Sequence, residues 1–325
     1  MTDPLSALLA ERPWLLADGA TGTNLFQVGL EAGEAPELWN VSQPEKVTAL
    51  NAGFVAAGSD IVLTNSFGGS RYRLKLHKAE ARVAELNAAA ARIARQAADA
   101  ARDRRVLVAG SLGPTGEILA PVGPLSEADA TAAFAEQASA LAEGGADLLW
   151  IETISSFEEL RAALAGAGTT GLPIVATLSF DTNGRTMMGV KPDELAAFAA
   201  EAAPKPAAYG ANCGSGAAEL VGAMLHMTAA ARPGDVLVAK SNCGIPEFVD
   251  GHICYSGTPE LMADYACLVR DLGVRIIGGC CGTTAEHVST MRAALTSRPP
   301  GPRPGLEEIA NTLGPLSAGA RGEAA

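Results

Sequence analysis

The sequence has little positive charge and no long uninterrupted apolar stretch. Lys and Arg number 24 against 36 Asp and Glu, which gives a formal net charge of −12, and no basic stripe stands out. Nucleic acids and membrane surfaces are therefore not expected as partners. The longest uncharged stretch, residues 162–180, contains three glycines and Pro173, which argues against a membrane span. The first residues lack the pattern of a secretory signal, so we expect a cytoplasmic protein.

Charged residues are also scarce, at 18% of the chain, whereas 48% of the residues are apolar. This composition excludes disorder as the main state and supplies one large core or two ordinary ones. The six cysteines are even in number, but a long chain without a secretory signal does not need disulfides. We therefore expect cysteines to serve a metal site or catalysis.

Eight short apolar runs, rich in Val, Ile and Leu, predict parallel strands that are buried on both faces. They span residues 14–17, 60–65, 106–111, 148–153, 174–180, 207–213, 236–241 and 274–280. Eight helical patterns follow them, over residues 44–57, 78–104, 126–143, 157–165, 192–202, 217–231, 259–272 and 285–296. This α/β alternation predicts a single (β/α)8 TIM barrel over residues 1–297. An open doubly wound sheet is the alternative, weakened by the lack of an early Gly-x-Gly-x-x-Gly turn.

The composition changes after Arg298. Residues 298–325 contain five Pro and five Gly, which predicts a flexible C-terminal tail. The alternative is an arm that docks on a partner subunit, because residues 306–313 can form a short helix. A homo-oligomer is therefore compatible with the sequence.

Three of the cysteines lie at the ends of predicted strands. Cys213 ends the sixth strand, and Cys280 and Cys281 end the eighth. The carboxyl ends of barrel strands meet at one rim, where active sites lie. Three thiolates and one open position are the ligand set of a catalytic zinc ion, although three small core cysteines are the alternative. The other three are expected to be core or loop residues: Cys243, Cys254 and Cys267.

The strand ends also carry motifs that resemble those of the homocysteine S-methyltransferase family. The motifs are DGATGT at residues 18–23, TNSFG at 64–68, GSLGP at 110–114, GANC at 210–213 and GGCCG at 278–282. The resemblance extends from residue 15 to residue 295, and it implies a barrel, in agreement with the strand count. It also implies that the three cysteines bind Zn²⁺ and that the homocysteine sulfur takes the fourth position.

The resemblance assigns further residues to homocysteine. Glu152 and Asp18 end two strands, and similar carboxylates in the family bind the amino group of homocysteine. A rim salt bridge or a capped turn is the alternative for each. Asn212 is expected to orient the loop of Cys213. The residues expected to surround the homocysteine carboxylate are Gly19, Thr64, Asn65, Ser66 and Phe67.

The expected methyl donor is a small onium compound, with glycine betaine as the first choice. We expect no folate- or cobalamin-binding module, because the homocysteine motifs already extend over most of the 325 residues. Trp39 lies in the loop after the first strand, where betaine enzymes carry a tryptophan, and is the expected donor contact. The alternative for Trp39 is an apolar packing residue under the barrel rim. The aromatic faces of Phe67, Tyr72 and Tyr255 are further candidates. The loop at residues 250–252 resembles that of bacterial betaine–homocysteine S-methyltransferases, the group that the chain resembles most.

One departure from the betaine pattern keeps other donors open. Mammalian-type betaine enzymes have a tyrosine after the phenylalanine that Phe67 resembles, whereas this chain has Gly68. The alternatives are a sulfonium donor, S-methylmethionine or dimethylsulfoniopropionate, and a methylcorrinoid partner protein. A donor contact by His252 is not expected.

Two other classes of function compete with methyl transfer. Lys240 ends the seventh strand, where a Schiff-base aldolase would place its lysine. That reading leaves the three cysteines unexplained. The second alternative is a regulatory zinc-binding protein on an inactive barrel. Such a protein would need no amino acid pocket, so the presence of Asp18, Glu152 and Thr64 argues against it.

Overall fold

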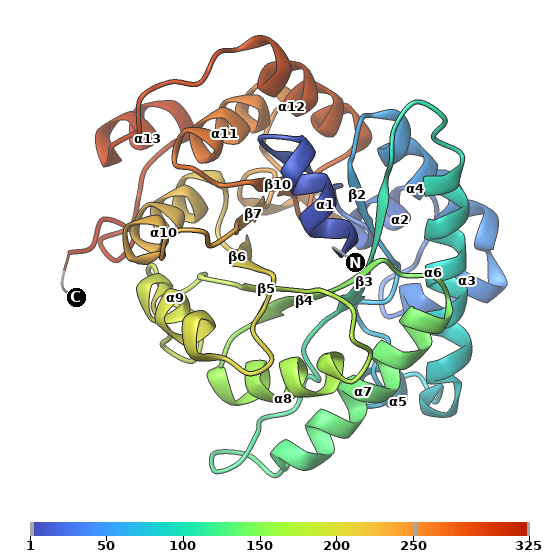
Figure 1. Ribbon diagram of the computed structural model, residues 1–325. Helices are drawn as coiled ribbons and strands as arrows, with labels where there is room; N and C mark the ends of the chain where they lie inside the picture. The colour runs from blue at the N-terminus through green and yellow to red at the C-terminus, as the bar shows by residue number, and fades with distance from the viewer. Residues whose placement is uncertain (1–2, 250–251, 324–325) are drawn as a thin grey trace.

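The computed structural model describes residues 3–249 and 252–323 and shows a (β/α)8 barrel, which confirms the predicted fold. Figure 1 shows the strands at the centre and the helices around them. The eight parallel strands follow the order β1-β10-β7-β6-β5-β4-β3-β2, and a bridge between Ala17 and Ile61 joins the first strand to the last. The strands are β1 (Leu15–Leu16), β2 (Ile61–Leu63), β3 (Leu107–Leu112), β4 (Leu148–Ile154), β5 (Ile174–Leu178), β6 (Ala208–Cys213), β7 (Leu237–Ser241) and β10 (Ile276–Gly279).

The predicted helices cover the outside of the barrel. They are α4 (Pro44–Ala56), α6 (Val83–Asp99), α7 (Glu127–Glu143), α8 (Phe157–Gly168), α9 (Pro192–Glu201), α10 (Ala217–Ala230), α11 (Pro259–Asp271) and α12 (Ala285–Ser297). Side-chain caps help to fix where they begin: Ser126, Ser156 and Thr258 each accept a hydrogen bond from the backbone N–H three residues later.

Several short elements were not predicted. They are α1 (Pro4–Glu11), α2 (Gly22–Gln27), η1 (Pro36–Leu38), α3 (Trp39–Ser42), α5 (Arg71–Lys75) and the hairpin of β8 (Pro246–Val249) with β9 (His252–Tyr255). The helical pattern predicted over residues 78–104 begins as the 3₁₀-helix η2 (Glu80–Arg82) and continues as α6. The segment between β1 and α4 and helix α5 matter most, because both line the cavity described below.

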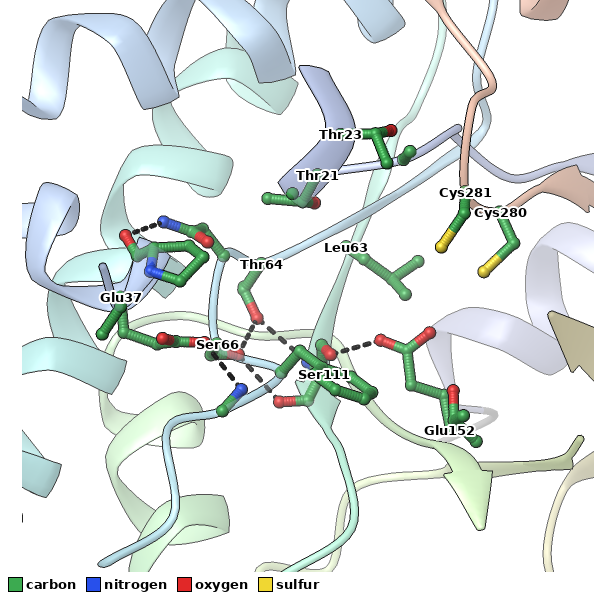
Figure 2. Close-up of a pocket in the computed structure, with 18 of the residues that line it drawn as sticks. Thr21, Thr23, Glu37, Leu63, Thr64, Ser66, Ser111, Glu152, Cys280 and Cys281 are labelled. Atoms are coloured by element: carbon green, nitrogen blue, oxygen red, sulfur yellow. Dashed lines mark hydrogen bonds between the residues drawn. The ribbon is translucent and has the colours of Figure 1, made fainter. Parts of the chain in front are cut away.

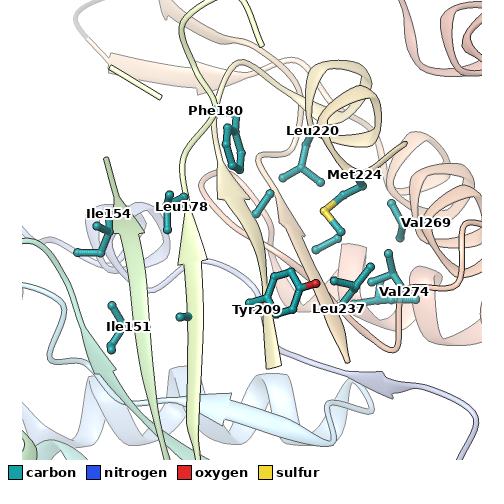
Figure 3. Close-up of a cluster of buried hydrophobic side chains, with 14 of the residues drawn as sticks. Ile151, Ile154, Leu178, Phe180, Tyr209, Leu220, Met224, Leu237, Val269 and Val274 are labelled. Carbon is teal, nitrogen blue, oxygen red and sulfur yellow. The ribbon is translucent and has the colours of Figure 1, made fainter. Parts of the chain in front are cut away.

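The core has two layers. The interior of the barrel is filled by side chains from the strands, and Leu5 and Leu8 of α1 pack among them. A larger apolar layer lies between the strands and the surrounding helices, as Figure 3 shows for Tyr209, Met224 and Val269. Burial of this apolar surface is the main driving force that holds the helices on the barrel.

The C-terminal segment differs from the expected flexible tail. Helix α13 (Leu306–Leu313) packs against α10 and α11, and Ile309 and Ala320 are fully buried. Arg303 donates a hydrogen bond to Thr228 Oγ1 at 2.6 Å. The Pro and Gly content alone did not predict this packed helix. Leu306, Ile309 and Leu313 recur at helical spacing, and they give the segment an apolar face. In the described part of the chain, no helix is both long and apolar enough to cross a bilayer.

Candidate active site

A cavity of about 470 Å³ opens at the carboxyl ends of the strands. Its volume lies within the range of small-molecule sites. The walls combine residues from the strand ends, the segment between β1 and α4, and helix α5. Figure 2 shows Cys280 and Cys281 on one side of this space and Glu37 on the other, with Thr64, Ser66 and Ser111 between them.

The three predicted cysteines come together on the wall of this cavity. The Sγ atoms of Cys213, Cys280 and Cys281 all lie within 4.8 Å of one another. Cys213 reaches this position with a φ of 62°, and Gly282 follows the pair with a φ of 79°. Left-handed backbone at these positions turns the chain sharply, which aims neighbouring side chains at one point. The three thiols can therefore hold a metal ion.

Two asparagines fasten the cysteine loops. Asn212 accepts a hydrogen bond from the N–H of Thr153 at 2.8 Å and donates to its hydroxyl at 2.7 Å. Its amide nitrogen also lies 3.9 Å from the Sγ of Cys280. Asn242 was not singled out by the sequence, yet it donates to the carbonyl of Gly214 at 2.6 Å and accepts from the N–H of Cys281 at 3.0 Å. Asn242 thus ties the loops after β6 and β10 together.

Without a metal, the surroundings of the three thiols raise the pKa of each and so favour the protonated form. The hydrogen bond with Cys213 and burial raise the pKa of Cys280, and the hydrogen bond with Cys281 opposes them only in part. A thiol with a raised pKa is a weak nucleophile. The cluster is therefore better suited to metal ligation, in which the metal displaces the protons, than to direct attack on a substrate.

Glu152 is a buried carboxylate on the same wall of the cavity as Ser111. It projects from β4, is 8% exposed, and accepts a hydrogen bond from the hydroxyl of Ser111. Burial raises its pKa, and the charge of Lys240 opposes this rise. A carboxylate held in this way is well placed to bind an ammonium group.

Asp18 differs from the expected substrate contact. It is 1% exposed, accepts a hydrogen bond from the N–H of Leu63 at 2.6 Å, and pairs with Lys240 Nζ at 2.7 Å. It is not among the described residues that line the cavity, whereas Lys240 is. Its charge is thus balanced inside the protein.

Lys240 does not have the environment of a Schiff-base lysine. Burial lowers its pKa, but the charges of Asp18 and Glu152 outweigh burial and raise the pKa. The ammonium also lies 5.5 Å from the ring centre of Trp150. A Schiff-base lysine requires a lowered pKa and a free amine, so this geometry disfavours the aldolase reading.

The loop after β2 forms the floor of the cavity as a hydrogen-bonded unit. Ser66 donates to the carbonyl of Ser111 at 2.8 Å, and Thr64 Oγ1 accepts from the N–H of Ser111 at 2.9 Å. Asn65 donates to the carbonyl of Pro36 at 2.7 Å, so its side chain supports the opposite wall. The expected homocysteine contacts that line the cavity are Gly19, Thr64, Asn65, Ser66 and Phe67.

Comparison with known proteins identifies the relationship. The family model described as homocysteine S-methyltransferase matches residues 15–295. The chain belongs to this family. The matched region contains every strand of the barrel and all three clustered cysteines.

Solved and curated members of the family show how far the similarity extends. The metallated homocysteine methyltransferase MmuM from Escherichia coli is 26% identical, with a TM-score of 0.74, over 90% of this chain and 99% of that one. The methionine synthases of Mycobacterium tuberculosis and Mycobacterium leprae are each 29% identical, over 87% and 90% of this chain. The chain spans only about a quarter of the length of these two relatives.

The side of the cavity opposite the thiols carries charged residues that the sequence did not reveal. Glu37 of η1 is 5% exposed, and its Oε1 accepts a hydrogen bond from the N–H of Gly68 at 2.6 Å. Burial raises the pKa of Glu37, while this hydrogen bond and the charges of Arg73 and His77 oppose the rise. Arg73 and His77 line the same cavity. Glu37 lies between β1 and α4, whereas Arg73 and His77 lie on and just after α5. These segments meet only in the fold, so no sequence motif marks the three residues.

The expected aromatic contacts with the donor lie elsewhere, except for Phe67. Trp39 is 3% exposed and packs in an apolar cluster with Leu25 and Val47, and Lys46 Nζ lies 4.4 Å from its ring centre. It is not among the described lining residues, so the structure differs from its expected place in the donor site. Its position just before α4 makes it a packing residue of that helix.

The remaining side chains under consideration have different environments. Tyr255 packs over Gly282 beside the thiol cluster and forms a side-chain hydrogen bond with Cys281. Tyr72 packs against the core, and neither tyrosine is among the described lining residues. Cys243 is buried and donates to the carbonyl of Gly257, outside the cluster. The side chains of Cys254 and His252 lie outside the described residues.

Proposed function

We propose that this protein transfers a methyl group from a small onium donor to the sulfur of homocysteine, giving methionine, with zinc held by Cys213, Cys280 and Cys281. The single observation that carries the proposal is the cluster of three thiols on the wall of a cavity that also contains the buried carboxylate of Glu152. Membership in the homocysteine S-methyltransferase family supports the acceptor. The metallated form of the Escherichia coli relative supports a metal.

The donor set fits zinc. Tetrahedral Zn²⁺ with Zn–S bonds of about 2.3 Å places its sulfur ligands roughly 3.8 Å apart. The three Sγ atoms, all within 4.8 Å of one another, need only small adjustments to reach this geometry. Three protein ligands leave one position for a substrate, whereas structural zinc is closed by four. Zinc bound here would lower the pKa of the homocysteine thiol and hold its sulfur as a thiolate.

The protein's own residues position the amino acid. Glu152 faces the cavity as a carboxylate and would bind the ammonium of homocysteine. The backbone of the loop after β2 borders the same space. The N–H groups of Thr64, Ser66 and Gly68 already donate within the protein, so those of Asn65 and Phe67 would bind the carboxylate. Asp18 would act indirectly, because its ion pair holds Lys240 beside Glu152. The substrate is thereby held at two ends, the arrangement that favours in-line attack.

In the transfer itself, the sulfur lone pair forms the new S–CH₃ bond while the bond from methyl to the onium atom breaks. The bonding electron pair leaves on that atom, and the thiol proton goes to water when homocysteine binds. With glycine betaine as donor, the product is dimethylglycine. Betaine is the first candidate on the resemblance to bacterial betaine enzymes, with S-methylmethionine, dimethylsulfoniopropionate and a methylcorrinoid protein as alternatives.

The test is methionine formation by reduced, zinc-loaded protein from homocysteine and one donor at a time. Turnover with glycine betaine supports the complete proposal. Turnover with a sulfonium compound alone keeps the acceptor and the zinc site and replaces the donor. Absence of methionine with every small onium donor contradicts the proposed donor class, and methylcobalamin then tests the corrinoid alternative.

A further inference from the structure

The inference concerns the wall of the cavity that faces the thiols. Glu37, Arg73 and His77 line this wall, and Figure 2 shows Glu37 across the pocket from Cys280 and Cys281. The proposed transfer uses the thiols, Glu152 and the loop after β2 for homocysteine. It assigns no role in acceptor binding to Glu37, Arg73 or His77, which leaves this wall for the second substrate.

Glu37 occupies space that a side chain at residue 68 would otherwise take. A Cβ built on Gly68 would lie 3.0 Å from Oε1 and 3.3 Å from Oε2 of Glu37. The glycine thus allows a carboxylate to reach the cavity wall, at the position where the mammalian-type betaine pattern has a tyrosine. Among the described residues, no cationic nitrogen lies within 4.0 Å of this carboxylate. The charges of Arg73 and His77 favour its ionised form without a direct ion pair, so the carboxylate can still attract a cation in the cavity.

Arg73 supplies the opposite charge. It lies on α5 two residues after Arg71, which pairs with Glu136 at 2.8 Å. Arg73 is half-buried and makes no ion pair with any residue that the structure describes. A Cβ on Gly116 would lie 3.2 Å from its Nη1, so the guanidinium rests against that glycine. A half-buried, unpaired guanidinium on a cavity wall suits a carboxylate, which it can bind through two hydrogen bonds.

We propose that Glu37 and Arg73 together recognise the methyl donor as a zwitterion, with Glu37 facing its onium group and Arg73 binding its carboxylate. This inference rests on the proposed function. A quaternary ammonium or sulfonium group cannot donate a hydrogen bond, so a nearby carboxylate stabilises it by charge alone. The arrangement needs no aromatic cage, in keeping with Gly68 and with the burial of Trp39 away from the cavity.

The chemical class of the donor follows. The subsite fits a small molecule that carries an onium methyl group and a carboxylate a few bonds apart. Glycine betaine and dimethylsulfoniopropionate share this chemistry, and separate assays distinguish the ammonium source from the sulfonium source. Cations without a carboxylate, such as tetramethylammonium, lack the group that Arg73 would bind. A methylcorrinoid protein is not a donor of this class.

The test measures kcat and KM for both substrates in wild-type protein and in Arg73→Met, Arg73→Lys and Glu37→Gln. Glu37→Gln keeps an oxygen that can accept from Gly68 while it removes the charge. Arg71→Met is the matched control, because Arg71 lies on the same helix, outside the described cavity lining.

The expected result is that Arg73→Met raises the donor KM by about 10- to 100-fold, the effect of losing charge-assisted hydrogen bonds. Arg73→Lys should fall between it and wild type, and Glu37→Gln should raise the donor KM at least about fivefold. The homocysteine KM should stay within about twofold in all three, and Arg71→Met should match wild type. This pattern separates donor recognition from a general structural effect.

Two other outcomes overturn the inference in distinguishable ways. If wild-type protein turns over betaine and Arg73→Met keeps the same donor KM, the subsite is wrong and the proposed function stands. If wild-type protein forms no methionine from any zwitterionic onium donor, the inference fails together with the proposed donor.

Discussion

The buried ion pair between Lys240 and Asp18 gives the sharpest prediction about stability. The two side chains are 2% and 1% exposed and lie 2.7 Å apart. Replacing Lys240 with Met would leave the Asp18 carboxylate with the N–H of Leu63 as its remaining described partner. Breaking a buried pair in this way costs about 3–5 kcal/mol of unfolding free energy. For a chain of 325 residues the loss corresponds to a fall in Tm of roughly 4–7 °C.

Removing Asp18 should cost less than removing Lys240. In Asp18→Asn, the ammonium of Lys240 still has the charge of Glu152 nearby, which offsets part of the loss. The double variant Asp18→Asn/Lys240→Met contains neither member of the pair. Its destabilisation should fall short of the sum of the two single variants by about 2–3 kcal/mol, since neighbouring sites are coupled.

The assay is urea denaturation of wild type, the two single variants and the double variant, monitored by circular dichroism and fluorescence. Lys205→Met is the control, because Lys205 is 56% exposed and its contact with Asp235 spans 3.5 Å. Asp235 is itself 4% exposed, but it keeps hydrogen bonds from the Tyr209 hydroxyl and the N–H of Arg232. Loss of the exposed lysine should therefore cost only about 0–1 kcal/mol. If Lys240→Met destabilised the protein no more than Lys205→Met, or if the single variants were additive in the double, the buried-pair argument would be refuted.

Three further predictions concern single side chains. Cys280→Ala should abolish stoichiometric zinc binding, measured by metal analysis after dialysis; a full equivalent of bound zinc would contradict the assigned ligands. Glu152→Gln should raise the homocysteine KM by about 10- to 100-fold and leave the donor KM unchanged in steady-state assays, because it removes a buried charge from the proposed ammonium site; an effect on the donor alone would reassign the residue. Trp39→Ala should cost about 3–5 kcal/mol in unfolding free energy, as expected for a buried aromatic residue, with little effect on the donor KM of the folded protein; a large rise in donor KM would return Trp39 to the site.

The strands of the barrel were predictable because burial on both faces leaves a direct mark on the sequence. The run at residues 174–180 contains the observed β5, and the run at 207–213 contains β6. Only apolar side chains fit between a central barrel and a ring of helices, so composition alone reveals these segments. The cysteine cluster was predictable for a related reason, since strand ends in a barrel share one rim.

Other parts of the molecule depend on packing that no local pattern records. Helix α1 is short, and only the fold shows that Leu5 and Leu8 enter the barrel interior. Glu37 and Arg73 lie 36 positions apart in the sequence, on a 3₁₀-helix and a five-residue helix, and neither is part of a motif. Trp39 was assigned by analogy of sequence position, whereas its actual neighbours come from α2 and α4. Asn242 resembles any turn asparagine until its two loops are seen together.

The central claim is that homocysteine binds through its sulfur to a metal held by Cys213, Cys280 and Cys281. X-ray absorption at the zinc edge measures this directly on reduced, zinc-loaded protein before and after homocysteine is added. The account predicts three sulfur ligands and one lighter atom without substrate, and four sulfur ligands with homocysteine. Homoserine, which carries oxygen in place of sulfur, should leave three. An unchanged count of three sulfur ligands in the presence of saturating homocysteine would contradict the account.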